Sequence, residues 1–190
     1  MECAVRMTEK ITEQDLVAEC KSGSRRAFES LYRANQRRVF SVSLSFFGGN
    51  REIAEDVTQQ VFLKIFNKIA DFRAESELTT WIYRMTINAC IDEQRKTRRF
   101  FSIENFFGEL RVKKTQDEKF EKREIANEVQ RAIGELKEKF RLPILLKYSE
   151  GLSYDEIAKV LDCSIGTVSS RLNRGHKMLA QKLKHLKKEI

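Results

Sequence analysis

Apolar residues recur three and four positions apart through most of this chain, which is the spacing typical of amphipathic helices. Before residue 100 the pattern predicts helices at about 12–20, 24–47, 50–69 and 78–99, with a polar loop at 71–77. After residue 117 it predicts helices at about 118–136, 141–149, 153–161 and 165–187. No apolar period is sustained through most of 100–123, and we interpret that stretch as a linker.

Capping and turn residues set the predicted helix bounds. Asp162 tolerates the left-handed backbone that a short turn after residue 161 often needs. Pro143 fits the helix at 141–149 because it would lie in the first turn, where no N–H donor is required. The predicted N-caps are Thr12 (in a capping box with Asp15), Ser24, Asn50 and Ser153.

The composition excludes an all-β fold, because a chain of 190 residues with 8 Gly and 1 Pro lacks the turn residues that join strands. We expect an all-α protein of two small helical domains, with a tail at 1–11, a first domain at 12–99, a flexible linker at 100–123 and a second domain at 124–190. Four linker phenylalanines, unusual for a disordered segment, could pack on the first domain or on a partner: Phe100, Phe101, Phe106 and Phe107.

Positive charge is in excess and concentrates near the C-terminus. The chain has 36 Lys and Arg against 28 Asp and Glu, a net charge of +8, and no acidic residue lies between Ile165 and Lys188. Such a surface favours polyanionic partners such as nucleic acid or an anionic membrane. No apolar run approaches the ~20 residues that cross a bilayer, so we expect a soluble, cytoplasmic protein.

The cysteines and histidines form no metal-binding pattern. The cysteines include no CxxC pair, and both histidines, His176 and His185, lie in the basic C-terminal segment. A zinc site therefore lacks a ligand set, and we expect no metal and no cofactor. We expect buried, reduced thiols at Cys3, Cys20, Cys90 and Cys163.

The helix at 50–69 has two contrasting faces. One is an apolar stripe made of Ala54, Val57, Val61, Ile65 and Ile69. The opposite face is polar but carries a leucine, with Phe66 at its edge; its members are Asp56, Gln59, Gln60, Leu63 and Asn67. This arrangement is typical of a protein-binding face with an apolar anchor, although scattered exposed apolar residues explain it equally well from this helix alone.

A single row of residues runs down the helix at 78–99, namely Trp81, Arg84, Asn88, Asp92, Arg95 and Arg99. Ile82, Met85 and Ala89 point elsewhere and could supply the core. The row could stack on unpaired bases and contact phosphates. Taken alone, these residues favour the plainer interpretation of a core tryptophan beside a solvated arginine face.

The strongest pattern is a predicted helix-turn-helix, in which a turn at 162–164 separates the last two helices. The apolar stripe of the second helix is Ile165, Val168, Leu172, Leu179, Leu183 and Leu186. Its small, polar and basic face suits a major groove and consists of Gly166, Thr167, Ser170, Asn173, Arg174, Lys177 and Gln181. Ser, Asn and Arg side chains can read base edges, whereas Thr167, Arg171 and Lys177 are better placed for phosphates.

Four segments together resemble bacterial sigma factors of the extracytoplasmic-function (ECF) type, in which only sigma domains 2 and 4 remain. They are AFESLYRANQRRVF (27–40), AEDVTQQVFLKIF (54–66), TTWIYRMTINACIDEQR (79–95) and EGLSYDEIAKVLDCSIGTVSSRLNRG (150–175). The resemblance implies a domain 2 bundle and a domain 4 helix-turn-helix. It also implies a transcription initiation factor that binds core RNA polymerase, recognises promoter −35 and −10 elements and promotes melting. Such factors are not enzymes, since the polymerase does the chemistry.

The resemblance assigns roles to the three faces. The polymerase-binding face, which would dock on the β′ clamp coiled coil, is Asp56, Gln59, Gln60, Leu63 and Phe66. The −10 and melting residues are Phe72, Arg73, Trp81, Arg84, Asn88 and Arg95. The −35 residues are Thr167, Ser169, Ser170, Arg171, Asn173, Arg174 and Lys177. The partners implied are core polymerase, through the β′ clamp and the β flap, promoter DNA and an anti-sigma factor, often a membrane-anchored one.

Two departures from the family pattern concern the −35 helix. Gly175-His176 stand where relatives often have Ala-Arg, which should remove a phosphate contact, and a mid-helix glycine costs about 1 kcal/mol of helix stability. Ser169 stands where relatives often have a basic residue. The −35 preference is therefore not transferred from any relative.

Two other classes of protein remain open. A conventional DNA-binding regulator would need only the helix-turn-helix and would leave the faces around Leu63 and Trp81 unexplained. A helical nucleic-acid enzyme would need a carboxylate cluster or a nucleophile–base pair. The acidic pairs at 55–56 and 92–93 lie on different predicted helices and match no such motif.

Overall fold

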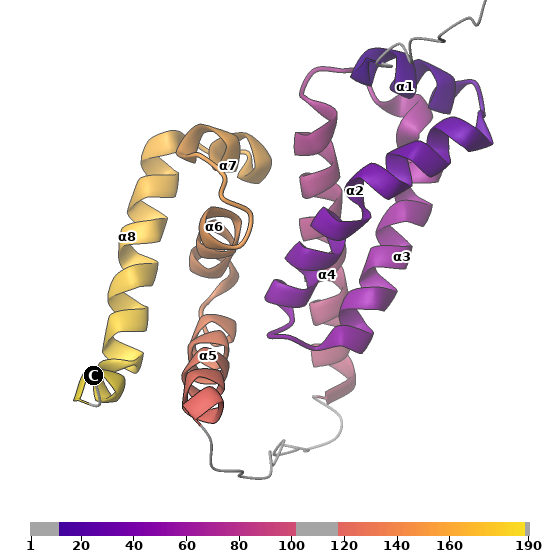
Figure 1. Ribbon diagram of the computed structural model, residues 1–190. Coiled ribbons are helices and arrows are strands. Elements are labelled where there is room, and N and C mark those ends of the chain that lie inside the picture. The colour runs from indigo at the N-terminus through magenta and orange to yellow at the C-terminus, as the bar shows by residue number, and fades with distance from the viewer. Residues whose placement is uncertain (1–11, 102–117, 189–190) are drawn as a thin grey trace, which may run out of the picture.

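The computed structural model describes residues 12–101 and 118–188, and all regular structure in these ranges is helical. The first helical group is α1 (Glu13–Lys21), α2 (Arg25–Phe46), α3 (Arg51–Lys68), the 3-10 segment η1 (Ile69–Asp71) and α4 (Leu78–Phe101). The second is α5 (Glu118–Gly134), α6 (Glu138–Tyr148), α7 (Tyr154–Leu161), α8 (Ile165–Lys182) and the 3-10 segment η2 (Lys184–Lys188) (Figure 1). The all-α prediction is confirmed. The predicted tail at 1–11 and Phe106 and Phe107 lie outside the described residues, as do the side chains of Phe100 and Phe101.

The predicted N-caps are all formed. The Ser24 hydroxyl accepts from the Ala27 amide, and the Asn50 side chain accepts from the Ile53 amide. Reciprocal capping boxes start α1 and α7, with the pairs Thr12–Asp15 and Ser153–Glu156. Because the carboxylate of Glu156 accepts hydrogen bonds from Ser153, its pKa is lowered.

The core of the first group lies between α2, α3 and α4, and the predicted α3 stripe is buried there. Three buried polar side chains bond carbonyls one turn back in their own helices: Asn35 to Leu31, Ser43 to Val39, and Thr86 to Ile82. These bonds satisfy donors that would otherwise be costly to bury.

Two of the predicted buried thiols are confirmed, at Cys20 and Cys90, while Cys163 is half-buried and Cys3 lies outside the described residues. Burial raises the pKa of Cys90 to about 12, and that of Cys20 is raised as well, also mainly by burial. Both thiols therefore stay protonated near neutral pH.

In the second group, the helix-turn-helix is confirmed, and Asp162 closes α7 with φ 49° and ψ 57°, in the left-handed region. Two details of the prediction are wrong. Ile165 is 50% exposed, because it is the first residue of α8 and lies at the end of the helix, not along its packed face. Pro143 lies in the second turn of α6, because that helix starts at Glu138, three residues before the predicted start.

The two groups pack against each other, with α7 along α4 and α6 along the end of α2, so that α6 and α7 lie between α8 and the first group (Figure 1). Residues 141–146 of α6 are all buried, because α8 covers one side of this helix and α2 another. Arg141 is among these buried residues, and its guanidinium lies 4.0 Å from the centre of the Phe46 ring. The contacts join both cores into one contiguous apolar cluster.

Candidate protein- and nucleic-acid-binding surfaces

The polar face of α3 has the orientation that the sequence predicts. Leu63 is 59% exposed and Phe66 is 56% exposed, whereas Val57 and Val61 are fully buried on the opposite side. Asp56 and Gln59 are exposed, and Gln60 is half-buried. Leu63 therefore contributes nothing to the core, and its exposure favours a role in binding a partner.

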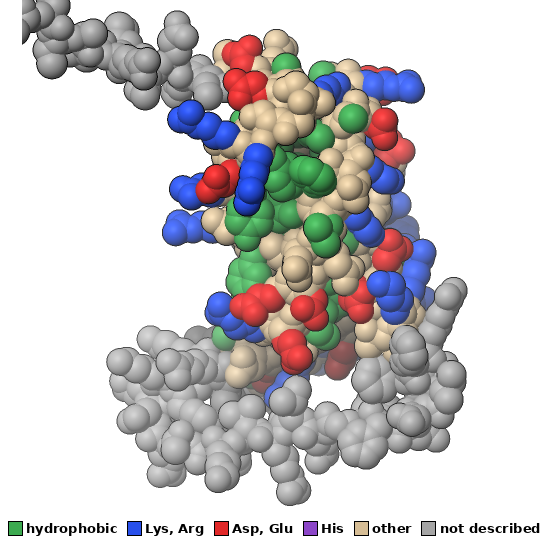
Figure 2. Space-filling view, turned by 90° about the vertical axis from the view of Figure 1, so that its right-hand side faces the viewer, with side chains coloured by type: hydrophobic (Ala, Val, Ile, Leu, Met, Phe, Trp, Pro, Cys, Tyr) green, Lys and Arg blue, Asp and Glu red, His purple; other side chains and the backbone are tan. Residues whose placement is uncertain are grey.

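Helix α2 supplies the other half of this surface. Between α2 and α3 runs a groove of about 860 Å³, and hydrophobic side chains gather in a band on this side of the molecule (Figure 2). Tyr32 packs on Phe62 with ring centres 4.6 Å apart, and Phe28 packs edge-on against Phe66 at 4.9 Å. Sequence reasoning missed the α2 residues Phe28, Tyr32 and Phe40, although their spacing of four and eight positions was the available signal.

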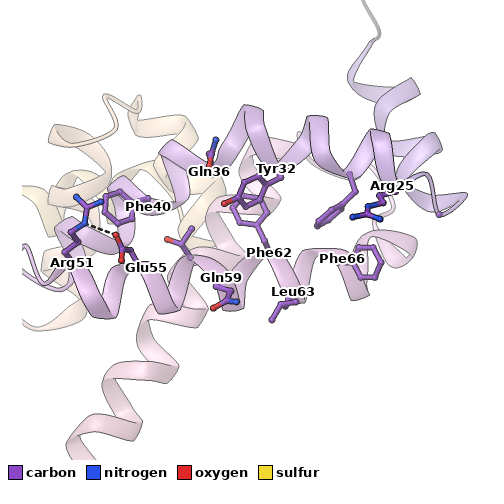
Figure 3. Close-up of a pocket in the computed structure, with 13 residues that line it drawn as sticks. Arg25, Tyr32, Gln36, Phe40, Arg51, Glu55, Gln59, Phe62, Leu63 and Phe66 are labelled. Carbon is purple, nitrogen blue, oxygen red and sulfur yellow. Dashed lines mark hydrogen bonds and ion pairs between the residues drawn. The ribbon is translucent and has the colours of Figure 1, made fainter.

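The two ends of this groove are charged. Arg25 lies beside Phe66 at one end, and at the other Arg51 pairs with Glu55 at 2.8 Å (Figure 3). An elongated apolar floor with polar ends suits an amphipathic helix laid along it. We call this surface, with the exposed face of α3, the α2–α3 groove.

The residues of the row predicted on α4 differ in their exposure to solvent. Asn88 and Arg95 are exposed, whereas Trp81 and Arg84 are half-buried. The ring of Trp81 packs against that of Phe72, 5.3 Å away, so the plainer interpretation of Trp81 as a core residue holds in part.

Helix α1 holds the loop before α4. Phe72 is buried in this loop, and its carbonyl accepts a 2.6 Å hydrogen bond from Lys21, whereas Arg73 is exposed. A carboxylate oxygen of Glu13 accepts from the first amide of α4, that of Leu78. Phe72 of this loop therefore packs against Trp81, while Arg73 of the same loop is exposed to solvent.

The basic face of α8 is open to solvent over most of its length. Ser169, Ser170, Asn173, Arg174 and Lys177 are exposed. A run of small and basic side chains on one exposed helical face is compatible with a major groove.

The remaining two −35 candidates are less available. The Thr167 hydroxyl lies 2.9 Å from that of Ser164, within the N-cap. Arg171 is half-buried, and its guanidinium points at the Cys163 sulfur, 3.9 Å away. Arg171 thus faces α4, away from the exposed face of α8.

In place of the arginine that the resemblance leads one to expect, His176 pairs with a tyrosine. Its Nε2 lies 2.9 Å from the hydroxyl of Tyr148, and the two rings meet edge-on. This contact ties α8 to the end of α6.

Two kinds of feature are absent from the described residues, a metal-binding cluster and a membrane-spanning helix. Within 12–101 and 118–188 no group of three or more His, Cys, Asp or Glu side chains is arranged to hold a metal ion. The same part of the chain contains no helix that is both long and apolar enough to cross a membrane.

Comparisons with known proteins match both helical groups. The Sigma-70 region 2 family matches residues 31–100, and the Sigma-70, region 4 family matches residues 126–179. The ECF RNA polymerase sigma-E factor of Haemophilus influenzae is 31% identical over 190 residues, covering 95% of this chain and 100% of that protein. The RNA polymerase sigma-H factor of Pseudomonas aeruginosa is 29% identical over 190 residues, covering 93% and 96%.

Solved structures share the fold. CnrH in complex with the cytosolic domain of CnrY aligns with a TM-score of 0.67 and 25% identity, over 90% of this chain and 96% of that one. The sigma factor RpoE in complex with the anti-sigma factor NepR, from Bartonella quintana, aligns with a TM-score of 0.63 and 23% identity, over 83% and 96%.

The helix-turn-helix, the exposed basic face of α8 and the separate α2–α3 groove are compatible with the class of two-domain transcription factors. The matches to Sigma-70 regions 2 and 4 and the relatives described above identify the family within that class. This chain belongs to the ECF family of RNA polymerase sigma factors, and it is a transcription initiation factor.

Proposed function

We propose that the α2–α3 groove binds core RNA polymerase by accepting the coiled coil of the β′ clamp. The observation that carries this proposal is the exposure of Leu63 and Phe66 beside the aromatic floor of the groove. Burial of such anchors inside a polar rim typically dominates binding energy. The residues assigned to this contact are Asp56, Gln59, Gln60, Leu63 and Phe66, extended by the α2 residues Phe28, Tyr32 and Phe40.

We propose that α4 and the preceding loop recognise and open the −10 element. Asn88 and Arg95 offer exposed hydrogen-bond donors, and Trp81 offers an aromatic edge supported by Phe72. Taking a base out of the stack costs a few kcal/mol, which a pocket with an aromatic wall can offset. The full set is Phe72, Arg73, Trp81, Arg84, Asn88 and Arg95.

We propose that α8 reads the −35 element, with the β flap of polymerase contacting the same domain. Ser169, Ser170, Asn173 and Arg174 would face base edges. Lys177 would contact phosphates from the exposed face of α8, and Thr167 and Arg171 would do so from the edge of the helix, where both are half-buried.

We propose that an anti-sigma factor controls this protein. Both solved neighbours were captured with a second protein, in one case the cytosolic domain of CnrY and in the other an anti-sigma factor. A membrane-anchored inhibitor is the form that we propose. The factor itself would act in the cytoplasm without catalysis of its own, because polymerase supplies the chemistry.

The polymerase contact is tested by Leu63→Asp in a pull-down with purified core polymerase. We expect a loss of affinity of about thirty-fold or more, since a hot-spot residue contributes about 2 kcal/mol or more. Helical content and Tm should stay near wild type, because Leu63 is exposed. Ile125→Asp is the matched control, because it places the same charge on an exposed aliphatic position of α5. Core binding by Leu63→Asp equal to that of the control would contradict the proposal.

A further inference from the structure

Helix α1 lies outside the stretch that matches Sigma-70 region 2, which starts at residue 31. None of the residues proposed for polymerase or promoter binding lies on this helix. Val17 and Cys20 are buried on its inner side, and α1 contacts η1, the segment that leads into the loop at 72–77 (Figure 1). Helix α1 therefore lies where it can act on the loop that we propose for −10 recognition.

Charged side chains of α1 contact both ends of this loop. At the first residue of the loop, Nζ of Lys21 donates a 2.6 Å hydrogen bond to the carbonyl of Phe72. After its last residue, the amide of Leu78 donates a 2.9 Å hydrogen bond to Oε1 of Glu13. The two α1 residues are eight positions apart, about 12 Å along the helix axis, so each reaches a different end. Hydrogen bonds with one ionised partner are stronger than neutral ones.

The contact of Glu13 also caps α4. Leu78 is the first residue of that helix, and the amides of a first helical turn have no partner within their own helix. A carboxylate at this position also faces the positive end of the helix dipole. Caps usually come from the residue just before the helix, whereas this one comes from a different helix. Glu13 thus fixes the start of the helix that carries Trp81 and Asn88.

The middle of the loop has a backbone conformation that needs support. Ala74 has φ 55°, in the left-handed region that a residue with a Cβ atom rarely adopts. Within the described part of the chain, the main-chain groups of residues 73–76 form no hydrogen bond with other main-chain groups. Residues 73–75 are exposed. Such a conformation persists only where the surrounding structure holds it.

The loop is not packed on α1 through its middle. A hollow of about 450 Å³ separates the two, lined by Gln14 and Ala18 of α1 and by Ser76 and Glu77 at the end of the loop. Phe72 is the buried side chain of the loop, and its ring lies 5.3 Å from that of Trp81. The position of the loop is therefore set from its ends.

From these contacts we infer that Glu13 and Lys21 are positioning residues, which hold the loop at 72–77 in the conformation that receives the unpaired −10 strand. The inference rests on the proposed role of α4 and this loop. Neither residue has to touch DNA, because Lys21 acts through Phe72 and Glu13 acts through Leu78. A loop that is ordered in advance binds more tightly, since the DNA does not have to order it.

The variant Glu13→Ala separates positioning from charge. Removing an acidic side chain near a polyanion should strengthen DNA binding by electrostatics alone, whereas loss of the loop contact should weaken it. The probe is a fork-junction DNA with an unpaired −10 non-template strand, taken from a promoter that the holoenzyme transcribes. We expect the holoenzyme to lose about ten-fold in affinity, because the apparent Kd rises as the competent fraction of the loop falls.

The matched control is Glu52→Ala, which removes an exposed acidic side chain from the first turn of α3. It should bind the fork-junction DNA at least as tightly as wild type. A duplex that ends upstream of the −10 element reports −35 binding alone, and Glu13→Ala should bind it as wild type does. Affinity of Glu13→Ala for the fork-junction DNA equal to or above that of the control would overturn the inference.

Conservative variants test the hydrogen bonds themselves. Glu13→Gln keeps an oxygen that can accept from Leu78, and Lys21→Arg keeps a cationic donor for the Phe72 carbonyl. Both should retain most of the affinity for the fork-junction DNA. Lys21→Met keeps the apolar stem without the donor and should lose affinity as Glu13→Ala does. Rescue variants as weak as the truncated ones would contradict the positioning role.

Trp81 reports the loop without DNA, because it is the only tryptophan of the chain and packs on Phe72. In Glu13→Ala and Lys21→Met its emission should shift to the red, and acrylamide should quench it more than in wild type and Glu52→Ala. Unchanged emission in both variants would overturn the inference. Circular dichroism is measured alongside, and should Glu13→Ala lose helical content, Lys21→Met decides the outcome.

Asn88→Ala separates failure of this inference from failure of the proposed −10 face. If Asn88→Ala loses affinity for the fork-junction DNA while Glu13→Ala and Lys21→Met retain it, the positioning role alone is wrong. If all three retain full affinity, the proposed −10 face is contradicted and the inference falls with it. Core binding should match wild type in each variant, because none of the three residues lines the α2–α3 groove.

Discussion

Gly175 of α8 packs directly against Ile144 of α6. A Cβ atom at Gly175 would lie 2.6 Å from the Cδ1 atom of Ile144 and 3.4 Å from the carbonyl oxygen of Phe140. Gly175 is buried where the two helices cross, so its missing side chain permits their close approach. A glycine inside a helix lowers helix stability by about 1 kcal/mol. At Gly175 this cost accompanies close helix packing that leaves no room for a side chain.

Helix propensity alone predicts that Gly175→Ala raises the free energy of unfolding. We expect a lower free energy of unfolding than that prediction, because the added methyl group clashes with Ile144. Overpacking costs about 1–3 kcal/mol, which offsets or exceeds the gain of about 1 kcal/mol from replacing glycine in a helix. Ile144→Val removes Cδ1 and should relieve the clash. Urea denaturation of the four proteins of this double-mutant cycle gives the coupling free energy, which we expect to be favourable by about 1 kcal/mol. Additive effects would show that Ile144 can move aside freely.

Asn88→Ala should permit a closed promoter complex but slow DNA melting, because Asn88 is exposed on the proposed −10 face. Trp81→Ala should do the same, with Tm measured because Trp81 also packs on Phe72. Permanganate reactivity of unpaired thymines reports melting directly. Asn127→Ala, which removes the same side chain from an exposed site on α5, serves as the control. Normal reactivity in both α4 variants would remove this face from the mechanism.

Arg174 and Lys177 should have separable effects on DNA binding, although both are exposed on α8. Arg174→Ala should flatten the preference at one −35 position, since a bidentate contact to guanine contributes about 1–3 kcal/mol of discrimination. Lys177→Ala should weaken all sequences alike and lower the salt slope by about one unit. The measurement is holoenzyme binding to promoters mutated singly through the −35 element. Equal depression of every promoter by Arg174→Ala would make Arg174 a phosphate contact and pass base reading to Ser170 and Asn173.

The α7 capping box should contribute stability that depends on pH. The pKa of Glu156 is lowered in the folded protein, so its contribution is present above the unfolded pKa of about 4.5 and is lost as pH falls through the folded value. Glu156→Gln keeps an acceptor for the Ser153 amide but does not titrate. Urea titrations should cover about pH 6 to about pH 3.5, a range of about 2.5 units that includes the unfolded pKa. Over this range the difference in unfolding free energy between the two proteins should shift in favour of the variant as pH falls. A pH-independent difference would contradict this account.

The buried face of α3 could be predicted from the sequence, because the spacing of the apolar residues along this helix determines which face packs into the core. Val61 and Leu63 differ by about 200° of helical rotation, which places them on nearly opposite sides, and Val61 is buried while Leu63 is exposed. The caps at Ser24, Asn50 and Ser153 were predictable for the same reason, since each bonds an amide three residues away.

The interdomain packing could not be predicted in this way. Arg141 is a charged residue in a charged stretch, yet it is buried in contact with Phe46 and Gln94, which lie far away in the chain. Phe72 reads as part of a polar loop but is buried by Trp81. Such contacts depend on tertiary structure, which a local pattern does not encode.

The central claim, that this protein directs core polymerase to promoters through two elements, is tested most directly by transcription in vitro. Core polymerase and the purified protein would transcribe fragments of the genome that encodes it, and the RNA 5′ ends would be mapped by sequencing. We expect discrete start sites that share one −35 and one −10 element, and we expect their loss with Leu63→Asp. Start sites identical to those of core polymerase alone would contradict the account.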